Sequence, residues 1–134
     1  MSYESSCVRS AAALIRTMGH SKQGHARDER GRVCGASQPR ARAVSIYGAL
    51  TRTLNLGDVE LQTGRKHSDL WAVLTQMASE RLKEMGLSAA GQIHPVFYLN
   101  DVPGFNAAAA MDFLGSVAER LEKVETNLKH GAAT

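Results

Sequence analysis

Apolar residues in the N-terminal half of the chain recur at three- and four-residue steps, the period of an amphipathic helix. This pattern predicts one helix over residues 5–18, which ends before Gly19, and a second over residues 39–56, which opens with Pro39 in its first turn. The second helix contains Gly48. Because glycine inside a helix costs about 1 kcal/mol relative to alanine, we expect Gly48 to permit close packing against another element.

The same period returns twice in the C-terminal half. Residues 68–85 carry a wide apolar face, start with Ser68 and Asp69, and are followed by Gly86. A last helix, capped by Asn106, carries apolar residues on one face as far as Leu128. We expect the tail of residues 130–134 to fray.

The segments between these helices differ in character. Residues 20–38 hold three glycines and many charges, which predicts an exposed excursion with little helix and a hairpin around residues 28–31. The assignment of residues 57–66 is open, although apolar and polar residues alternate there in a way that could make a short strand. Residues 95–99 are an apolar run that predicts a strand or extended stretch, and Pro103-Gly104 then fits a type II turn.

Together these elements predict a mainly α fold. About four helices form one compact domain over residues 1–129, with a long loop after the first helix and a short extended segment before the fourth. The composition, 43% hydrophobic and 22% charged over 134 residues, is that of a globular domain. No apolar run approaches the roughly 20 residues of a membrane span, and the N-terminus lacks the pattern of a secretory signal. We therefore expect a cytoplasmic protein without membrane contacts.

Recognised catalytic and cofactor motifs are absent. Cys34 could in principle combine with a histidine and Asn100 for nucleophilic catalysis, but no known local signature surrounds it. His20 and His25 with Cys34 lack the short paired spacing of a zinc site, and no phosphate-binding glycine motif occurs. We expect no metal and no cofactor, and the sequence favours a non-enzymatic protein without excluding an enzyme.

Charge is unevenly distributed along the chain. Residues 1–56 contain nine lysines and arginines against three acidic residues, and residues 57–134 contain seven against ten. The basic stretch could contact nucleic acid or an acidic partner, although a solvated loop is the simpler interpretation. The candidate basic patch consists of Arg27, Arg30, Arg32, Arg40, Arg42 and Arg52.

The most specific polar pair is Asn100-Asp101, just before the predicted turn. Asn and Asp at such positions commonly bond backbone amides to hold the turn, and this structural role is the favoured interpretation. A binding pocket becomes the better interpretation if Gln23 and this pair converge beside His20. The candidate contact residues for a ligand or partner are therefore His20, Gln23, Arg27, Asn100 and Asp101.

Several short segments resemble the motifs of one family. Residues 19–24, Gly-His-Ser-Lys-Gln-Gly, resemble a Gly-Trp-x-Gln-Gly motif with one insertion and His20 for tryptophan, and residues 27–31 resemble an Arg-Asp-x-x-Gly turn. Residues 41–50 resemble a helix with Gly-Ala and an upstream cysteine, which is Ser45 here. Residues 99–104, Leu-Asn-Asp-Val-Pro-Gly, resemble Trp-Asn-Asp-x-Pro-Gly.

These motifs are those of a family of small proteins from actinobacteria and their phages, catalogued as a domain of unknown function. The resemblance implies a cytoplasmic, often phage- or mobile-element-encoded protein, and it carries no established activity.

Three functional hypotheses follow. The first is a small non-enzymatic binding or regulatory protein that acts on a host or phage protein complex. The second is a nucleic-acid-associated protein that uses the basic stretch of residues 27–52. The third is a small enzyme or ligand binder with a pocket near His20 and Asn100-Asp101. A protein is the expected partner, and the sequence does not indicate an oligomeric state.

Overall fold

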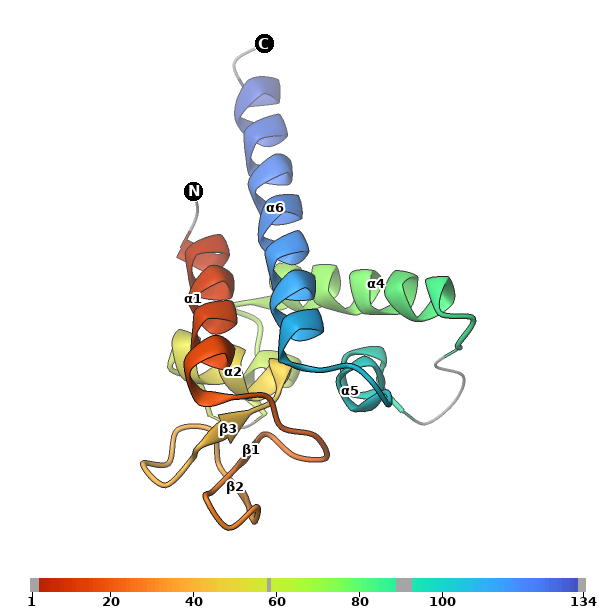
Figure 1. The fold of residues 1–134 in the computed structure, drawn as a ribbon. Coiled ribbons are helices and arrows are strands. Elements are labelled where there is room, and N and C mark those ends of the chain that lie inside the picture. Colours follow the sequence, from red (N-terminus) through yellow and green to blue (C-terminus); the bar gives the residue numbers. More distant parts are fainter. Residues whose placement is uncertain (1–2, 58, 89–92, 133–134) are drawn as a thin grey trace.

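The computed structural model describes the backbone of residues 3–57, 59–88 and 93–132, and the side chains of these residues as far as residue 124. The fold is mainly helical with one small sheet (Figure 1). In chain order the elements are α1 (Tyr3–Met18), β1 (Ala26–Arg27), β2 (Val33–Cys34), β3 (Ala43–Val44), α2 (Ile46–Leu54), α3 (Glu60–Thr63), α4 (Ser68–Glu84), α5 (Pro95–Asp101) and α6 (Ala107–Ala132). None of the described helices combines the length and apolar character that crossing a bilayer requires.

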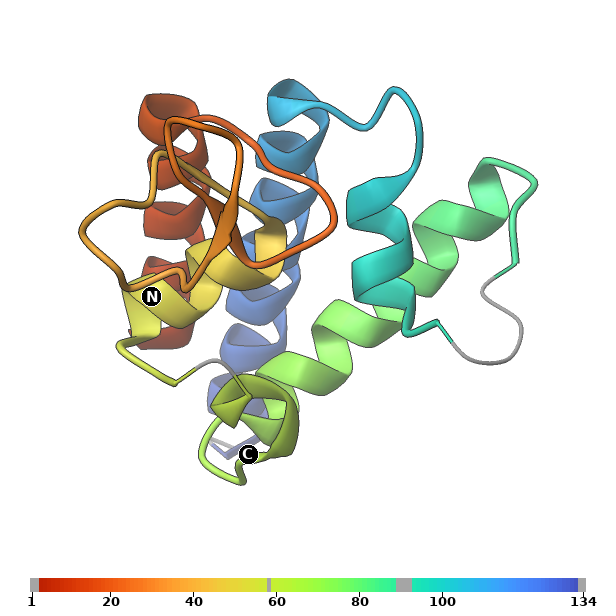
Figure 2. The same ribbon diagram turned by 90° about the horizontal axis from the view of Figure 1, so that it is seen from below.

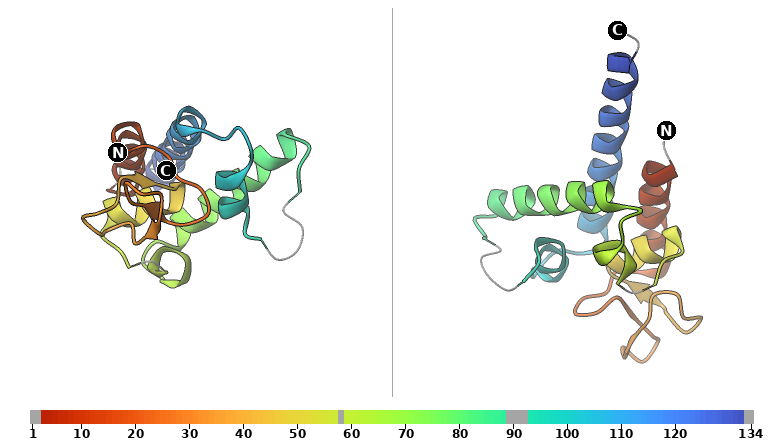
Figure 3. Two further views of the ribbon diagram at one scale, coloured as in Figure 1. Left: turned by 60° about the horizontal axis from the view of Figure 1, so that its bottom comes forward. Right: turned by 180° about the vertical axis from the view of Figure 1, so that it is seen from behind.

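Helices α1 and α6 lie side by side, and α1 also packs on α2 (Figure 1). Helix α4 crosses α6, and the short helix α5 packs against α4 on the side of the small sheet (Figure 2). The C-terminal turns of α6 extend beyond the other elements, as the rear view shows (Figure 3). The sheet has the order β2-β1-β3 with both pairs antiparallel, and it covers the end of α1 and α2.

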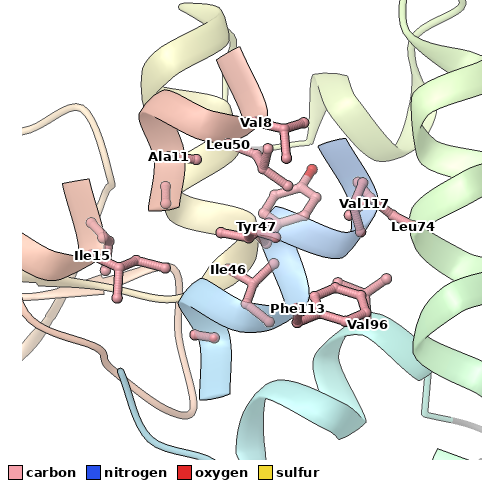
Figure 4. Close-up of a cluster of buried hydrophobic side chains, with 14 of the residues drawn as sticks. Val8, Ala11, Ile15, Ile46, Tyr47, Leu50, Leu74, Val96, Phe113 and Val117 are labelled. Atoms are coloured by element: carbon pink, nitrogen blue, oxygen red, sulfur yellow. The ribbon is translucent and has the colours of Figure 1, made fainter. Parts of the chain in front are cut away.

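The core is built from the apolar stripes that the sequence pattern predicts. Helices α1, α2 and α6 each direct a stripe into one cluster, and Leu74 and Val96 join it from α4 and α5 (Figure 4). Burial of each large side chain stabilises the fold by about 1.5–3 kcal/mol. The three helices contribute Val8, Ala11, Ile15, Ile46, Tyr47, Leu50, Phe113 and Val117, all of them almost completely buried.

Several local predictions are confirmed. Gly19 and Gly86 follow α1 and α4 with φ angles of 105° and 75°, the left-handed conformation of a helix end. The Asn106 side chain accepts a hydrogen bond from the Ala109 N–H and so caps α6. The type II turn also forms, because Gly104 has a φ of 86° and the Phe105 N–H donates to the Val102 carbonyl at 3.0 Å.

The predicted start of the second helix at Pro39 is wrong. Residues 43–44 are extended and pair with β1 as strand β3, so α2 begins only at Ile46. Ser45 has φ −78° and ψ 173°, and its side chain accepts the Gly48 N–H as the helix N-cap. The pairing with β1 therefore overrides the helical pattern that Pro39 suggested.

The predicted extended segment over residues 95–99 is also wrong, because these residues form helix α5. The His94 side chain accepts the Val96 N–H as N-cap, and Pro95 occupies the first turn. Val96, Leu99 and Asn100 point inward at helical spacing. The prediction of about four helices is thus refined to six helices in the described residues, with α5 and α3 as the additional ones.

Other expectations about the connections are corrected in detail. Residues 60–63 form the single turn α3, in which Leu61 is buried while Val59 stays exposed, so no strand forms there. The hairpin around residues 28–31 is present, but the excursion that carries it is only partly exposed, since Ala26 and Cys34 join the core. Helix α6 continues to Ala132, and fraying beyond residue 130 stays a prediction.

Gly48 makes the close contact that its helical position predicts. A Cβ atom at this position would lie 1.9 Å from the backbone oxygen of His25. That oxygen also accepts the N–H of Ser45 at 2.9 Å, so the backbone of residue 25 is fixed directly against the first turn of α2.

We predict that Gly48→Ala lowers the free energy of unfolding by about 1–3 kcal/mol or more, because backbone atoms must move to admit the methyl group. The control is Gly115→Ala in α6, where an added Cβ meets nothing within 4 Å. Helix propensity predicts that this control stabilises by up to about 1 kcal/mol. Urea unfolding measures the free energy of unfolding of both variants. An equal change in the two would contradict the close contact at Gly48.

Candidate functional site

A buried amide, the Asn100 side chain on α5, joins three segments that are distant in sequence. Asn100 is 4% exposed. Its Oδ1 accepts the Ile46 N–H at 3.0 Å and lies 2.7 Å from Nε2 of His20. Its Nδ2 donates to the Ser21 carbonyl and to Oδ1 of Asp101, both at 3.0 Å. The end of α5, the loop after α1 and the first turn of α2 are therefore held together at one point.

This network defines the protonation of His20. Because Nδ2 of Asn100 faces two oxygen atoms, Oδ1 must be the acceptor, and neutral His20 donates from Nε2. Burial lowers the pKa of His20, the hydrogen bond to Asn100 opposes this shift, and the charge of Lys22 adds to it. The ring also meets Phe105 edge-on at 5.7 Å. His20 is thus a neutral structural donor near pH 7.

Asp101 holds the loop after α1 in an uncommon conformation. Its Oδ1 accepts the Gln23 N–H at 2.9 Å, and Gln23 has a φ of 58°, which non-glycine residues rarely adopt. Next to it, the ammonium of Lys22 donates to the Val102 carbonyl. The loop is therefore tied to the C-terminal end of α5 by two contacts besides Asn100.

Arg27 is part of the same hydrogen-bond network. Its guanidinium donates to the carbonyl oxygens of Lys22 at 3.0 Å, Gly31 at 2.6 Å and Gln23 at 3.2 Å. These three bonds connect the β1–β2 hairpin to the loop that Asp101 holds. The predicted contact residues His20, Gln23, Arg27, Asn100 and Asp101 are thus brought together, and most of their polar atoms bind one another or nearby backbone.

The predicted basic patch is divided between two roles. Arg42 donates to the Pro39 and Ala41 carbonyls, and Arg52 donates to the Ala36 carbonyl, so both hold the loop together, as Arg27 does. The other three members, Arg30, Arg32 and Arg40, are exposed, and Arg42 is exposed as well although it bonds the loop backbone.

Asp28 accompanies the exposed arginines at the hairpin. Its carboxylate accepts the backbone N–H groups of Arg32 and Arg30. The pKa of Asp28 is lowered mainly by the Arg32 N–H, with help from the Arg30 N–H and the charges of Arg32 and Arg40. The charges of Arg32 and Arg40 therefore act on a carboxylate that stays ionised and offsets part of their charge.

Two hollows lie on either side of Asp101. Their volumes are about 260 Å³ and about 190 Å³. No lysine or arginine is found among the described residues that line them. The larger hollow is lined by Gly24, His25, Ser45, Phe97, Asn100 and Asp101, and the smaller by Ile93, Tyr98, Asp101, Val102 and Pro103.

Aromatic rings form the wall of the larger hollow. The His25 ring stacks on Tyr47 with centroids 4.7 Å apart, and the Phe97 ring lies 6.3 Å from His25. The cluster continues through the buried Tyr47 to the partly exposed Trp71, which stacks on His94 at 4.6 Å. These contacts fix the rings at the hollow in place.

The sequence pattern did not identify His25, Phe97 and Tyr98 as site residues. A helical interpretation of residues 95–101 would have found part of the site, because Phe97 and Asp101 are then one turn apart on the same face. The signal for it was Pro95, a residue common at the first position of a helix.

The polar side chains of the larger hollow are mostly committed to structure. Ser45 Oγ accepts the Gly48 N–H at 2.9 Å and donates to the His25 carbonyl at 3.2 Å, so no imidazole activates it. Cys34 is buried in β2, and no described histidine side chain bonds to it. Among the described residues no group of three histidine, cysteine or acidic side chains could hold a metal ion.

The fold and the site define a small, mainly helical domain in which a loop after the first helix is locked onto a short helix beside two hollows. The sequence profile of the Family of unknown function DUF6197 matches residues 4–120, and the chain belongs to this family. No curated protein and no solved structure was found to match the chain.

We predict that Asn100→Ala lowers the free energy of unfolding by about 2–4 kcal/mol, because it leaves several buried donors and acceptors without partners. The control is Asn106→Ala, which removes only the cap of α6 and should cost about 1 kcal/mol. Chemical denaturation at pH 7.5 measures both. Equal losses would show that Asn100 holds no more than a local turn.

Acidification should destabilise the chain through His20 and His94. Burial lowers the pKa of both below the ordinary value of 6.5. The unfolded chain therefore takes up these protons first as the pH falls. Stability is full above about pH 6.5 and declines as the pH drops from there through the lower folded pKa values.

The measurement is the free energy of unfolding at intervals between pH 7.5 and 5.5. His20→Gln, which can still donate to Asn100, should reduce the slope in this range. A free energy that is constant or increases on acidification would contradict the assignment of two buried neutral histidines.

Proposed function

We propose that the chain is a non-enzymatic binding protein that holds a segment of a partner protein against α5. The observation that carries this proposal is the pair of hollows that share Asp101 as a common wall. Two adjacent hollows suit two neighbouring side chains of one bound segment. We name this surface the α5 groove, formed by the residues that line the two hollows.

The size of the hollows favours side chains over small-molecule ligands. Pockets for drug-sized ligands have volumes of about 300–1,000 Å³, and both hollows, at about 260 Å³ and about 190 Å³, are smaller. A nucleotide or a large cofactor would exceed either one. A single amino-acid side chain fits each, which supports a protein as the partner.

The rigidity of the groove also supports binding. Asn100 and Asp101 fix the loop of residues 20–24 to α5, and Ser45 fixes the backbone of residue 25 to α2. A preformed surface loses less conformational entropy when a partner binds. Because the Asn100 amide makes all four of its hydrogen bonds and the Ser45 hydroxyl has already donated its proton to the His25 carbonyl, these residues supply shape rather than a reactive group.

The nucleic-acid alternative receives less support from the geometry. Three of the six arginines in the basic patch hold the loop backbone, and Tyr47, the aromatic residue of the 27–52 stretch, is buried. Base stacking on exposed aromatic rings, which strengthens single-strand binding, has no platform there. In our proposal the partner is instead a component of a host or phage protein complex, and binding regulates that complex.

The test compares two variants that place the same charge on exposed apolar positions. Ile93, at the groove, is 55% exposed, and Val59, on the remote α3 turn, is 60% exposed, so neither change should disturb the core. We expect Ile93→Asp to reduce partner capture at least about tenfold, since a carboxylate is poorly tolerated in an apolar contact. Val59→Asp should leave capture unchanged.

Captured proteins are quantified by mass spectrometry after pulldown from lysate of the native host, with and without nuclease treatment. Equal capture by the two variants and the parent chain would contradict the α5 groove as the contact site. Capture that disappears with nuclease treatment and falls steeply between low and moderate salt would favour the nucleic-acid alternative.

A further inference from the structure

We propose that the larger hollow of the α5 groove selects a basic side chain, lysine or arginine, of the bound segment, and that the smaller hollow takes an apolar neighbour. This inference rests on the proposed function and specifies which partner segment fits. The observation behind it is the carboxylate of Asp101, which lies between the two hollows. The larger hollow has aromatic walls and the smaller one is largely apolar, and no lysine or arginine is among the described residues that line them.

The charge argument concerns Asp101. Its Oδ1 already accepts two hydrogen bonds, from Gln23 and Asn100, whereas no described residue bonds its Oδ2. The ammonium of Lys22, in the loop that Asp101 holds, is directed to the Val102 carbonyl. Among the described residues, one oxygen of a half-buried carboxylate is therefore left for a ligand, and a charge-assisted hydrogen bond to a cation is the strongest contact that it can make.

The aromatic walls favour the same ligand. The rings of Phe97 and His25 lie 6.3 Å apart at 46°, and both line the hollow next to Asp101. The face of a Phe, Tyr or Trp ring attracts a cation within about 6 Å, and Phe97 is the ring of this kind in the described lining. The apolar walls also suit the methylene stem of lysine or arginine, whose charged end would then reach Asp101.

An anionic ligand is disfavoured by the same features. A phosphate or carboxylate group in this hollow would face the charge of Asp101, and the described lining offers no lysine or arginine to offset it. The exposed cations Arg30, Arg32, Arg40 and Arg42 belong to the hairpin and the loop before β3, and none of them lines the groove. The groove therefore favours cationic ligands, whereas the exposed arginines of the hairpin and the loop before β3 favour anionic ones.

The smaller hollow supplies the second contact. It is lined by Ile93, Tyr98, Val102 and Pro103, and Ile93 is exposed although its side chain is apolar. A bound segment with leucine next to lysine would cover this apolar surface while its cation reaches the first hollow. This is the reason for committing to a peptide rather than to a free amine.

Three probes test the selection by nuclear magnetic resonance titration of the isotopically labelled chain: blocked Leu-Lys dipeptide, blocked Leu-norleucine dipeptide, and n-butylammonium. We expect Leu-Lys to shift the amide signals of Gly24, His25 and Asp101 and to bind about tenfold more tightly than Leu-norleucine, which lacks only the charge. Butylammonium should bind more weakly than Leu-Lys because it reaches one hollow. If it binds as tightly, the peptide part of the proposal is overturned in favour of a free amine.

The variant Asp101→Asn should abolish the preference for Leu-Lys, because an amide keeps the Oδ1 acceptor for Gln23 but loses the charge. Asp112→Asn, which removes an exposed carboxylate on α6, should keep the preference. Phe97→Leu should reduce the preference while retaining an apolar wall, and it provides an independent measurement if Asp101→Asn lowers the melting temperature.

The outcomes separate this inference from the proposed function. Equal affinity of the two dipeptides, or a preference unchanged in both Asp101→Asn and Phe97→Leu, overturns cation selection and leaves the groove as a binding surface. No shift at the groove with either dipeptide also overturns cation selection. If Ile93→Asp and Val59→Asp in addition capture partners equally, the proposed function fails as well.

Discussion

The fold around the candidate site depends on the hydrogen bonds of one buried amide, the side chain of Asn100. It contacts the loop after α1 through His20 and Ser21, and the first turn of α2 through Ile46. The Ser21 carbonyl and the Ile46 N–H are buried and His20 is half-buried, so removing the amide would leave polar groups unsatisfied, at about 1–3 kcal/mol for each buried group. The amide thus determines where α5 lies relative to both segments.

The residues that resemble family motifs mostly build this junction. The His20 side chain bonds Asn100, the Arg27 side chain bonds nearby backbone, the backbone N–H of Gln23 bonds Asp101, and Gly48 allows α2 to approach the backbone of His25. Their chemistry is therefore largely used within the fold. The groups that remain available for a partner lie directly beside them, in the hollows around Asp101.

Charge divides the surface of the loop region into two parts. The hairpin and the loop before β3 expose Arg30, Arg32, Arg40 and Arg42, while the groove on α5 presents a carboxylate between aromatic and apolar walls. The proposed cation selection and the nucleic-acid alternative thus concern different surfaces. They make opposite predictions about the charge of the ligand.

The sequence by itself determined the helices that bury a continuous apolar stripe, namely α1, α4 and α6, together with the caps at Gly19, Gly86 and Asn106. Periodicity and capping act between residues a few positions apart, so they can be read along the chain. Only the tertiary structure decided that residues 43–44 form a strand and that residues 95–101 form a helix, because short segments take their conformation from distant partners. The junction itself joins His20 to Asn100 across 80 positions. No local pattern encodes such a contact. The position of the groove depends on this contact and is therefore not encoded locally either.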